Sequence, residues 1–290
     1  MLTDRQRFYF AQASPTFTRQ DVLDGKVVRL NPALITITDG LVEKLPPEAL
    51  QERVLAQVEL LLEHGKIRTF HVDVNFEDYG GFGAKRPDIN TVIFTPNFLT
   101  RLSERVQAAG AFLDLHLLTD HPLDRLREFE AIPLGAVCFQ LDAVREVAAL
   151  EALVHQIIEM GACASPVIET VGTENRPPLP VEATFALLEP ILPSVGMLTF
   201  QASSTAARSN QRGGCFDHVA PYIARARRTF DGTFQIQGGI TTETIGDAMR
   251  LGAEFLVCGT QIFRNSQGLI PPQVVDRLLA EAACTLTSKP

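Results

Sequence analysis

The sequence has few cysteines, no long apolar run and no block of basic residues. Its five cysteines include no C-x-x-C pair, which argues against a disulfide framework or a structural zinc ribbon and favours reduced thiols. No apolar run reaches the length of a membrane span, and the opening MLTDRQRFYF lacks the apolar stretch of a signal peptide. We therefore expect a cytoplasmic protein that does not contact a membrane.

Charge and lysine content exclude further classes of function. The net charge is −8 without a basic stripe, which argues against nucleic-acid binding but permits one bound phosphate, because backbone N–H groups suffice to hold it. None of the lysines falls within a predicted strand, so an aldolase that forms a Schiff base on a desolvated lysine is not expected. The glycines at 80, 81 and 83 do not match G-x-G-x-x-G, so no dinucleotide site is predicted.

Short apolar segments alternate with longer amphipathic ones along the chain. Strands are predicted at 33–37, 68–74, 112–118, 136–141, 163–168, 196–201, 233–237 and 254–258. Helices are predicted at 46–64, 96–109, near Pro122, at 147–160, from about 181 to 192, and at 216–230, 242–251 and 271–283. Eight strand–helix units predict a single-domain (β/α)₈ TIM barrel over residues 31–290, with residues 1–30 as an N-terminal extension. An open doubly wound sheet is the alternative.

Two of the predicted strands carry histidine and aspartate with i, i+2 spacing. His71 and Asp73 point to one face of the second strand, and Asp114 and His116 to one face of the third. Active sites of such barrels lie at the C-terminal ends of the strands, where His71, Asp73 and His116 form a ligand set for Zn²⁺, Fe²⁺ or Mn²⁺. Asp114 is deeper and is expected to orient a ligand. The alternative is that the histidines are hydrogen-bonded core residues.

Glycines mark the ends of the last two strands, where barrels of this kind commonly bind phosphate. Without side chains, they let backbone N–H groups approach a ligand closely. The candidate substrate-binding residues here are Gly238, Gly239, Gly259 and Thr260. Gly213 and Gly214, with Arg208 and Arg212, are candidates for a third wall after the sixth strand.

The motifs together resemble the ribulose-phosphate 3-epimerase family over residues 31–265. That family carries P-S-I-L-S, H-x-D-V, D-x-H-L, D-G-G-I and G-S-x-I-F on its first, second, third, seventh and eighth strands. The corresponding segments here are P-A-L-I-T at 32–36, H-V-D-V at 71–74, D-L-H-L at 114–117, Q-G-G-I at 237–240 and G-T-Q-I-F at 259–263.

The resemblance implies a small phosphorylated sugar as substrate and a homo-oligomer. In the family, D-ribulose 5-phosphate and D-xylulose 5-phosphate interconvert through an enediolate, beside a divalent metal held by two His and two Asp. Carried over, the metal ligands are His71, Asp73 and His116, and Asp73 is also an acid/base. Thr36 supplies a hydroxyl near the substrate, and the glycines of the last two strands hold the phosphate with Thr260.

The sequence departs from the family at Gln237, where the family has an Asp that is both fourth ligand and second proton carrier. A glutamine amide can donate a hydrogen bond or weakly ligate a metal, but it cannot act as a base. Three hypotheses follow. The protein is a divergent sugar-phosphate epimerase or isomerase in which Glu169 or Asp142 replaces the acid, a metal-dependent lyase or aldolase that uses Asp73 as its single base, or a non-catalytic sugar-phosphate binder.

Overall fold

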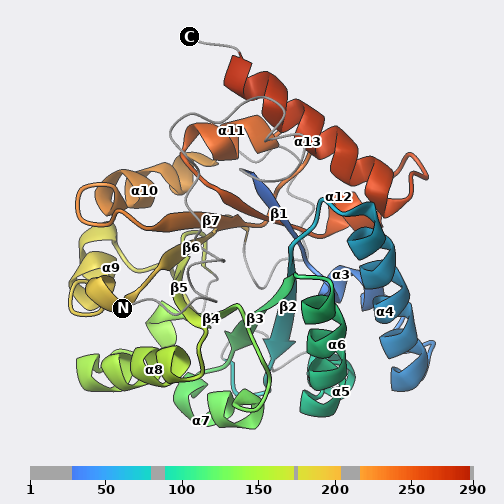
Figure 1. Ribbon diagram of the computed structural model, residues 1–290. Helices are drawn as coiled ribbons and strands as arrows, with labels where there is room; N and C mark the ends of the chain where they lie inside the picture. Colours follow the sequence, from blue (N-terminus) through green and yellow to red (C-terminus); the bar gives the residue numbers. More distant parts are fainter. Residues whose placement is uncertain (1–27, 80–88, 173–175, 204–215, 288–290) are drawn as a thin grey trace.

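The computed structural model describes residues 28–79, 89–172, 176–203 and 216–287. In these residues, eight parallel strands form one sheet in the order β1-β8-β7-β6-β5-β4-β3-β2 (Figure 1). A bridge between Ala33 and His71 joins β1 to β2, and the amide of Leu34 donates to the carbonyl of His71 at 2.9 Å, which closes the barrel. The strands are β1 (Arg29–Pro32), β2 (Thr69–Asn75), β3 (Phe112–Leu118), β4 (Ala136–Gln140), β5 (Cys163–Glu169), β6 (Met197–Gln201), β7 (Thr233–Gln237) and β8 (Phe255–Cys258). The predicted TIM barrel is confirmed.

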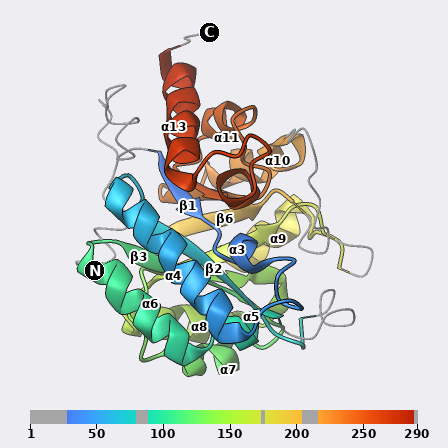
Figure 2. The same cartoon turned by 90° about the vertical axis from the view of Figure 1, so that its right-hand side faces the viewer.

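Helices surround the strands (Figures 1 and 2). The last helix, α13, packs against both α11 and α4, where the last strand–helix unit of the barrel meets the first. The α-helices are α3 (Ile35–Thr38), α4 (Pro47–His64), α5 (Ile89–Ile93), α6 (Pro96–Ala108), α7 (Pro122–Leu126), α8 (Val147–Glu159), α9 (Val181–Leu188), α10 (Ala220–Ala226), α11 (Ile245–Arg250), α12 (Thr260–Phe263) and α13 (Pro271–Thr287). Short 3₁₀ turns are η1 (Arg127–Phe129), η2 (Leu141–Ala143), η3 (Leu192–Ser194) and η4 (Phe216–His218). Among the described helices, none is both long and apolar enough to span a membrane.

Local sequence signals explain where the long outer helices begin and end. Helix α4 starts with Pro47, whose fixed φ suits the first helical position, and stops at Gly65, whose φ of 82° closes the helix in the left-handed region. Helix α6 starts after Thr95, whose hydroxyl accepts the amide of Phe98 at 3.3 Å. These signals set the ends of the helices close to where the periodicity predicts them.

The first strand is the exception. The run Ala-Leu-Ile-Thr-Ile at 33–37 predicts a strand, but β1 ends at Pro32 and Ile35–Thr38 forms the helical turn α3. Barrel pairing ends at Ala33, and the Thr38 hydroxyl donates to the carbonyl of Ile35 at 3.0 Å, which supports the turn. Tertiary position therefore overrides β propensity here. Residues 1–27, most of the predicted extension, lie outside the described residues.

The barrel interior is apolar at its base and polar above. Phe255, Met197 and Cys163 come from the first residues of their strands and pack together at the base with Ala136, Cys138 and Val167. Above them the inward positions are buried amides, hydroxyls, carboxylates and imidazoles. The larger apolar core lies outside the strands, between the sheet and the helices. The polar upper interior is where a site can form.

Burial raises the thiol pKa of three of the cysteines. It raises the pKa of Cys258 to about 12 and, with the nearby charge of Asp114, raises that of Cys138 well above its usual value. Burial also raises the pKa of Cys163. We expect iodoacetamide at about pH 8 to alkylate the exposed Cys284 but none of these three, because alkylation requires an accessible thiolate. Peptide mass spectrometry checks this, with labelling in guanidinium as the control; modification of Cys258 in the folded protein would contradict it.

Candidate metal and substrate site

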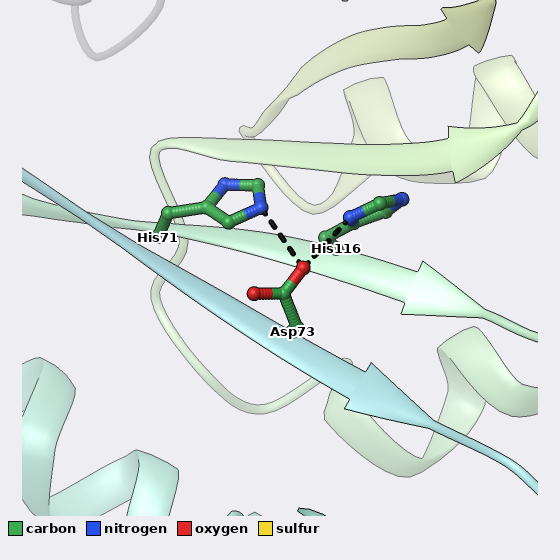
Figure 3. A group of neighbouring side chains, drawn as sticks. All are labelled: His71, Asp73 and His116. Carbon is green, nitrogen blue, oxygen red and sulfur yellow. Dashed lines mark hydrogen bonds and ion pairs between the residues drawn. The ribbon is translucent and has the colours of Figure 1, made fainter. Parts of the chain in front are cut away.

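The inward residues of β2 and β3 meet in register at the centre of the barrel. His71 lies beside Asp114, and Asp73 lies beside His116. The i, i+2 spacing on each strand sends all four side chains inward, as the sequence predicts. Figure 3 shows His71 and His116 both pointing at the carboxylate of Asp73.

Asp73 contacts the two histidines and Gln237 through one carboxylate oxygen. Its Oδ1 atom is 3.2 Å from His71 Nε2, 3.0 Å from His116 Nδ1 and 3.1 Å from the amide nitrogen of Gln237. The two imidazoles are completely buried, whereas Asp73 retains 6% of its surface exposed. Of these three side chains, only that of Asp73 retains exposed surface.

Asp114 fixes the orientation of His71 through the Nδ1 atom of the ring. Its Oδ2 atom is 3.0 Å from His71 Nδ1 and also accepts the side-chain amide of Asn31 at 2.6 Å. Its Oδ1 accepts the thiol of Cys138, and Gln235 donates to its Oδ2 at 3.3 Å. With the Nδ1 proton held by Asp114, the Nε2 atom of His71 is directed at Asp73.

His116 is oriented from the opposite side by Gln140. Its Nε2 atom is 3.2 Å from the Gln140 amide nitrogen, and the Gln140 amide oxygen is buried without a hydrogen-bond partner among the described residues. Without a metal, His116 Nδ1 donates to the Asp73 carboxylate, and the Gln140 amide faces Nε2. With that amide turned over, its oxygen would accept a proton on Nε2 and leave the Nδ1 lone pair to a metal ion.

The carboxylates decide the charge of the group. Burial alone would lower the pKa of His71, but Asp73 and Asp114 outweigh it and raise that pKa to about 10. Burial opposes ionisation of Asp73 as well, yet His71 and His116 hold its pKa well below the usual range. Burial outweighs the hydrogen bond to Asp73 at His116 and lowers the pKa of that histidine. Without a metal, His71 is thus an imidazolium and Asp73 a carboxylate.

These residues fit a divalent metal ion. Asp73 Oδ1 lies 3.2 Å from His71 Nε2 and 3.0 Å from His116 Nδ1, separations that suit ligands of one ion with bonds of about 2.0–2.2 Å. The amide oxygen of Gln237 is buried beside them, with no hydrogen-bond partner in the described parts of the chain. The ligand set joins two borderline nitrogen donors to hard oxygens, which suits zinc, iron or manganese. The ligand roles of the three residues stay a prediction.

The glycines of the predicted phosphate site border the same end of the barrel. Gly238 and Gly239 follow β7 with φ of 94° and 73°, values that other residues rarely adopt. A Cβ atom on Gly259, after β8, would lie 2.1 Å from the hydroxyl oxygen of Thr36. Thr36 therefore abuts the end of β8 from α3, although no strand carries it there, and Thr260 opens α12.

Several predicted residues are not part of this cluster. Gly213 and Gly214, with Arg208 and Arg212, lie outside the described residues. Asp142, one candidate for the replacement acid, is ion-paired with Arg176, which also binds Asp120 at 2.5 Å. Glu169, the other candidate, ends β5 and accepts the amide of Gly172 at 3.2 Å. Of the two residues, Glu169 lies on a barrel strand, whereas Asp142 lies in the 3₁₀ turn η2 after β4.

Sequence reasoning missed the polar residues that hold the cluster. These residues come from three different strands: Asn31 from β1, Cys138 and Gln140 from β4, and Gln235 from β7. The i, i+2 pairs Cys138/Gln140 and Gln235/Gln237 were the local signals available, since alternate residues of a strand share a face. Asn31 joins the cluster only through the closure of the barrel.

Comparison with known proteins identifies the family. Residues 49–263 match the ribulose-phosphate 3 epimerase family. The chain belongs to this family. The resemblance seen in the motifs is thereby confirmed.

A curated relative supports the same assignment. The ribulose-phosphate 3-epimerase of Candida glabrata is 24% identical over 190 residues, which cover 65% of this chain and 69% of that protein. Solved structures show the same fold at lower identity. The 3-hexulose-6-phosphate synthase of Salmonella typhimurium has a TM-score of 0.60 at 13% identity, covering 89% of this chain and 99% of that one. KGPDC from Streptococcus mutans has a TM-score of 0.59 at 7% identity, covering 90% and 99%.

Proposed function

We propose that this family member is a sugar-phosphate epimerase or isomerase that moves a proton on the carbon next to a ketose carbonyl. One observation carries the proposal: an ionised, partly accessible carboxylate, Asp73, lies between two oriented imidazoles at the C-terminal end of the barrel. The name of the Candida glabrata relative supports the substrate class.

A divalent metal held by His71, Asp73 and His116 would supply the Lewis acid for this reaction. When bound, it stabilises the negative charge that develops on the enediolate as the proton leaves carbon. Asp114 would keep the Nδ1 proton of His71, and Gln140, with its amide turned over, the Nε2 proton of His116, so that the opposite ring nitrogen of each could bind the ion. The protein's own part is to hold these groups in place before substrate arrives.

Asp73 would accept the proton from one face of the substrate. Its carboxylate is ionised and, unlike the two imidazoles, retains some exposed surface, and a general base must be unprotonated and within reach of the substrate. Gln237 donates to Asp73 and would fix its orientation, but it cannot exchange protons itself. Return of a proton to the other face is assigned to Glu169, at the end of β5.

The phosphate would bind where β7, β8 and the start of α3 meet. Gly238, Gly239 and Gly259 leave the backbone open to a ligand there, and Thr36 and Thr260 add hydroxyls. This location places the phosphate beside the strand that carries Gln237. The carbon chain then extends from there toward Asp73.

A single-base lyase or aldolase is the second candidate. The specific observation in its favour is Gln237 itself, since a reaction that breaks a carbon–carbon bond through the same enediolate needs only one base.

Solvent deuterium exchange tests these proposals. The protein loaded with Mn²⁺ is incubated with D-ribulose 5-phosphate in D₂O, and the sugar is examined by NMR. Deuterium at C3 with formation of the epimer supports the epimerase. Exchange without inversion favours the single-base lyase, and absence of exchange at every carbon would leave a non-catalytic binder.

Metal binding should release one proton. His71, with its pKa raised to about 10, must lose its proton to become a ligand, whereas Asp73 is already ionised. The apparent affinity for Mn²⁺ should therefore rise about tenfold per pH unit from neutral pH up to about pH 10. Calorimetry in buffers with different ionisation enthalpies measures this proton count. An affinity independent of pH would contradict the ligand role of His71.

A further inference from the structure

Gln201, the last residue of β6, is a buried amide beside the proposed metal site. Its backbone pairs in register with Gln237 on β7 and with Glu169 on β5, so the three side chains share the inner face of the barrel. Gln237 contacts Asp73. Gln201 thus lies one strand away from the residue that touches the proposed base, and only 3% of its surface is exposed.

The backbone carbonyl of Ser203, which can only accept a hydrogen bond, fixes the orientation of the Gln201 amide. The Nε2 atom of Gln201 donates to the carbonyl oxygen of Ser203 at 2.9 Å and lies 3.4 Å from the Ser203 hydroxyl oxygen. A carbonyl only accepts, so the nitrogen end must point at Ser203. The other end, Oε1, is buried and has no hydrogen-bond partner in the residues that the structure describes.

The arrangement depends on a glycine in the next strand's loop. A Cβ atom on Gly238 would lie 2.1 Å from the hydroxyl oxygen of Ser203, so a side chain there would displace the serine that holds Gln201. Gly238, Ser203 and Gln201 therefore form one packed unit beside the proposed phosphate site. A buried acceptor without a partner is costly, and such acceptors are commonly satisfied by a ligand or by ordered water.

We propose that Gln201 determines substrate specificity by accepting a hydrogen bond from a hydroxyl group on the carbon chain of the sugar phosphate. An amide oxygen repels phosphate and carboxylate oxygens and pairs with O–H donors. The ligand class is therefore a phosphorylated polyol or ketose with a hydroxyl between the phosphate and the reacting carbon. This inference rests on the proposed sugar-phosphate function, but it concerns binding and not turnover.

Two ligands of equal chain length test the proposal. Calorimetry compares ribitol 5-phosphate, which carries hydroxyls, with n-pentyl phosphate, which carries none, in the presence of Mn²⁺. The wild type should bind ribitol 5-phosphate about tenfold or more tightly than pentyl phosphate. Gln201→Met removes the acceptor at similar size and should reduce this ratio about tenfold, leaving the affinity for pentyl phosphate within about twofold.

Matched variants separate this role from a structural one. Gln51→Met makes the same change on helix α4, outside the barrel strands, where the amide nitrogen of Gln51 donates to the carbonyl of Ile93. This variant should keep the wild-type ratio. Gln201→Leu also removes the acceptor at similar size and should reduce the ratio about tenfold, which covers the case in which Gln201→Met does not fold.

Equal weakening of both ligands by Gln201→Met would overturn the proposal, as would an unchanged ratio or a wild type without preference for ribitol 5-phosphate. The proposed function fails separately, through absent deuterium exchange. If the protein shows no deuterium exchange but its preference for ribitol 5-phosphate depends on Gln201, the role of Gln201 in binding stands and the proposed epimerase or isomerase activity does not.

Discussion

Replacing Asp73 with asparagine should lower deuterium exchange into D-ribulose 5-phosphate by about 10³-fold or more, the scale on which loss of a general base is felt. The change keeps the size of the side chain but removes the charge that faces His71 and His116. It also removes the one anionic ligand of the proposed metal site, so the affinity for Mn²⁺ should fall in parallel. Exchange followed by NMR, and Mn²⁺ binding followed by calorimetry, measure the two losses.

A surface aspartate provides the control for Asp73→Asn. Asp276 on α13 is half exposed and pairs with Lys66 and His64, an arrangement that contributes little to stability. Asp276→Asn should therefore leave exchange and metal affinity within about twofold of wild type. If Asp73→Asn retained more than about a tenth of wild-type exchange, another group would be the base, since a lost base costs at least about 10²-fold.

Replacing Gln237 with aspartate should make the protein more dependent on metal. The new carboxylate would lie beside Asp73, whose Oδ1 is now 3.1 Å from the Gln237 amide nitrogen. Two neighbouring carboxylates repel, so the metal-free variant should lose about 2 kcal/mol of unfolding free energy. The additional anionic ligand should raise the affinity for Mn²⁺ about 10-fold to 100-fold. Denaturant unfolding with and without Mn²⁺ checks both effects.

The same variant tests what limits turnover. If the amide at 237 is the main departure from the family, Gln237→Asp should gain pentulose-phosphate epimerisation, because it restores a second proton carrier. Gln235→Glu is the control, since it adds a carboxylate one layer deeper, against Asp114, and should destabilise the protein whether or not Mn²⁺ is present. Equal destabilisation of both variants in Mn²⁺ would contradict the position assigned to the metal.

Regular patterns made most of the fold predictable. Strands β3 and β7 begin and end where their apolar runs predict, because each is bounded by turn residues and buried on both faces. The start of the barrel was not predictable in this way. The run Ile35–Thr38 has strand propensity but follows Pro32 at the point where pairing ends, and closure of the barrel, which local sequence does not record, turns it into a helix.

Part of the candidate site was likewise predictable from strand periodicity, and part of it depends on closure of the barrel. His71, Asp73 and His116 were found because i, i+2 spacing on adjacent strands fixes both the face and the height of each side chain. Asn31 and Gln201 were not found, because their contacts arise only when the strands of the barrel are in register around its axis. The binding role proposed for Gln201 also depends on a side-chain oxygen without a hydrogen-bond partner in the described residues, which no sequence pattern reveals.

Anomalous diffraction from crystals soaked in Mn²⁺ tests the central claim most directly. The account predicts one strong peak at about 2.0–2.2 Å from His71 Nε2, from a carboxylate oxygen of Asp73 and from a ring nitrogen of His116. It also predicts that Asp114 remains hydrogen-bonded to His71 Nδ1 and outside the coordination sphere. A peak between Asp114 and Cys138, or none within reach of Asp73 at saturating Mn²⁺, would contradict it.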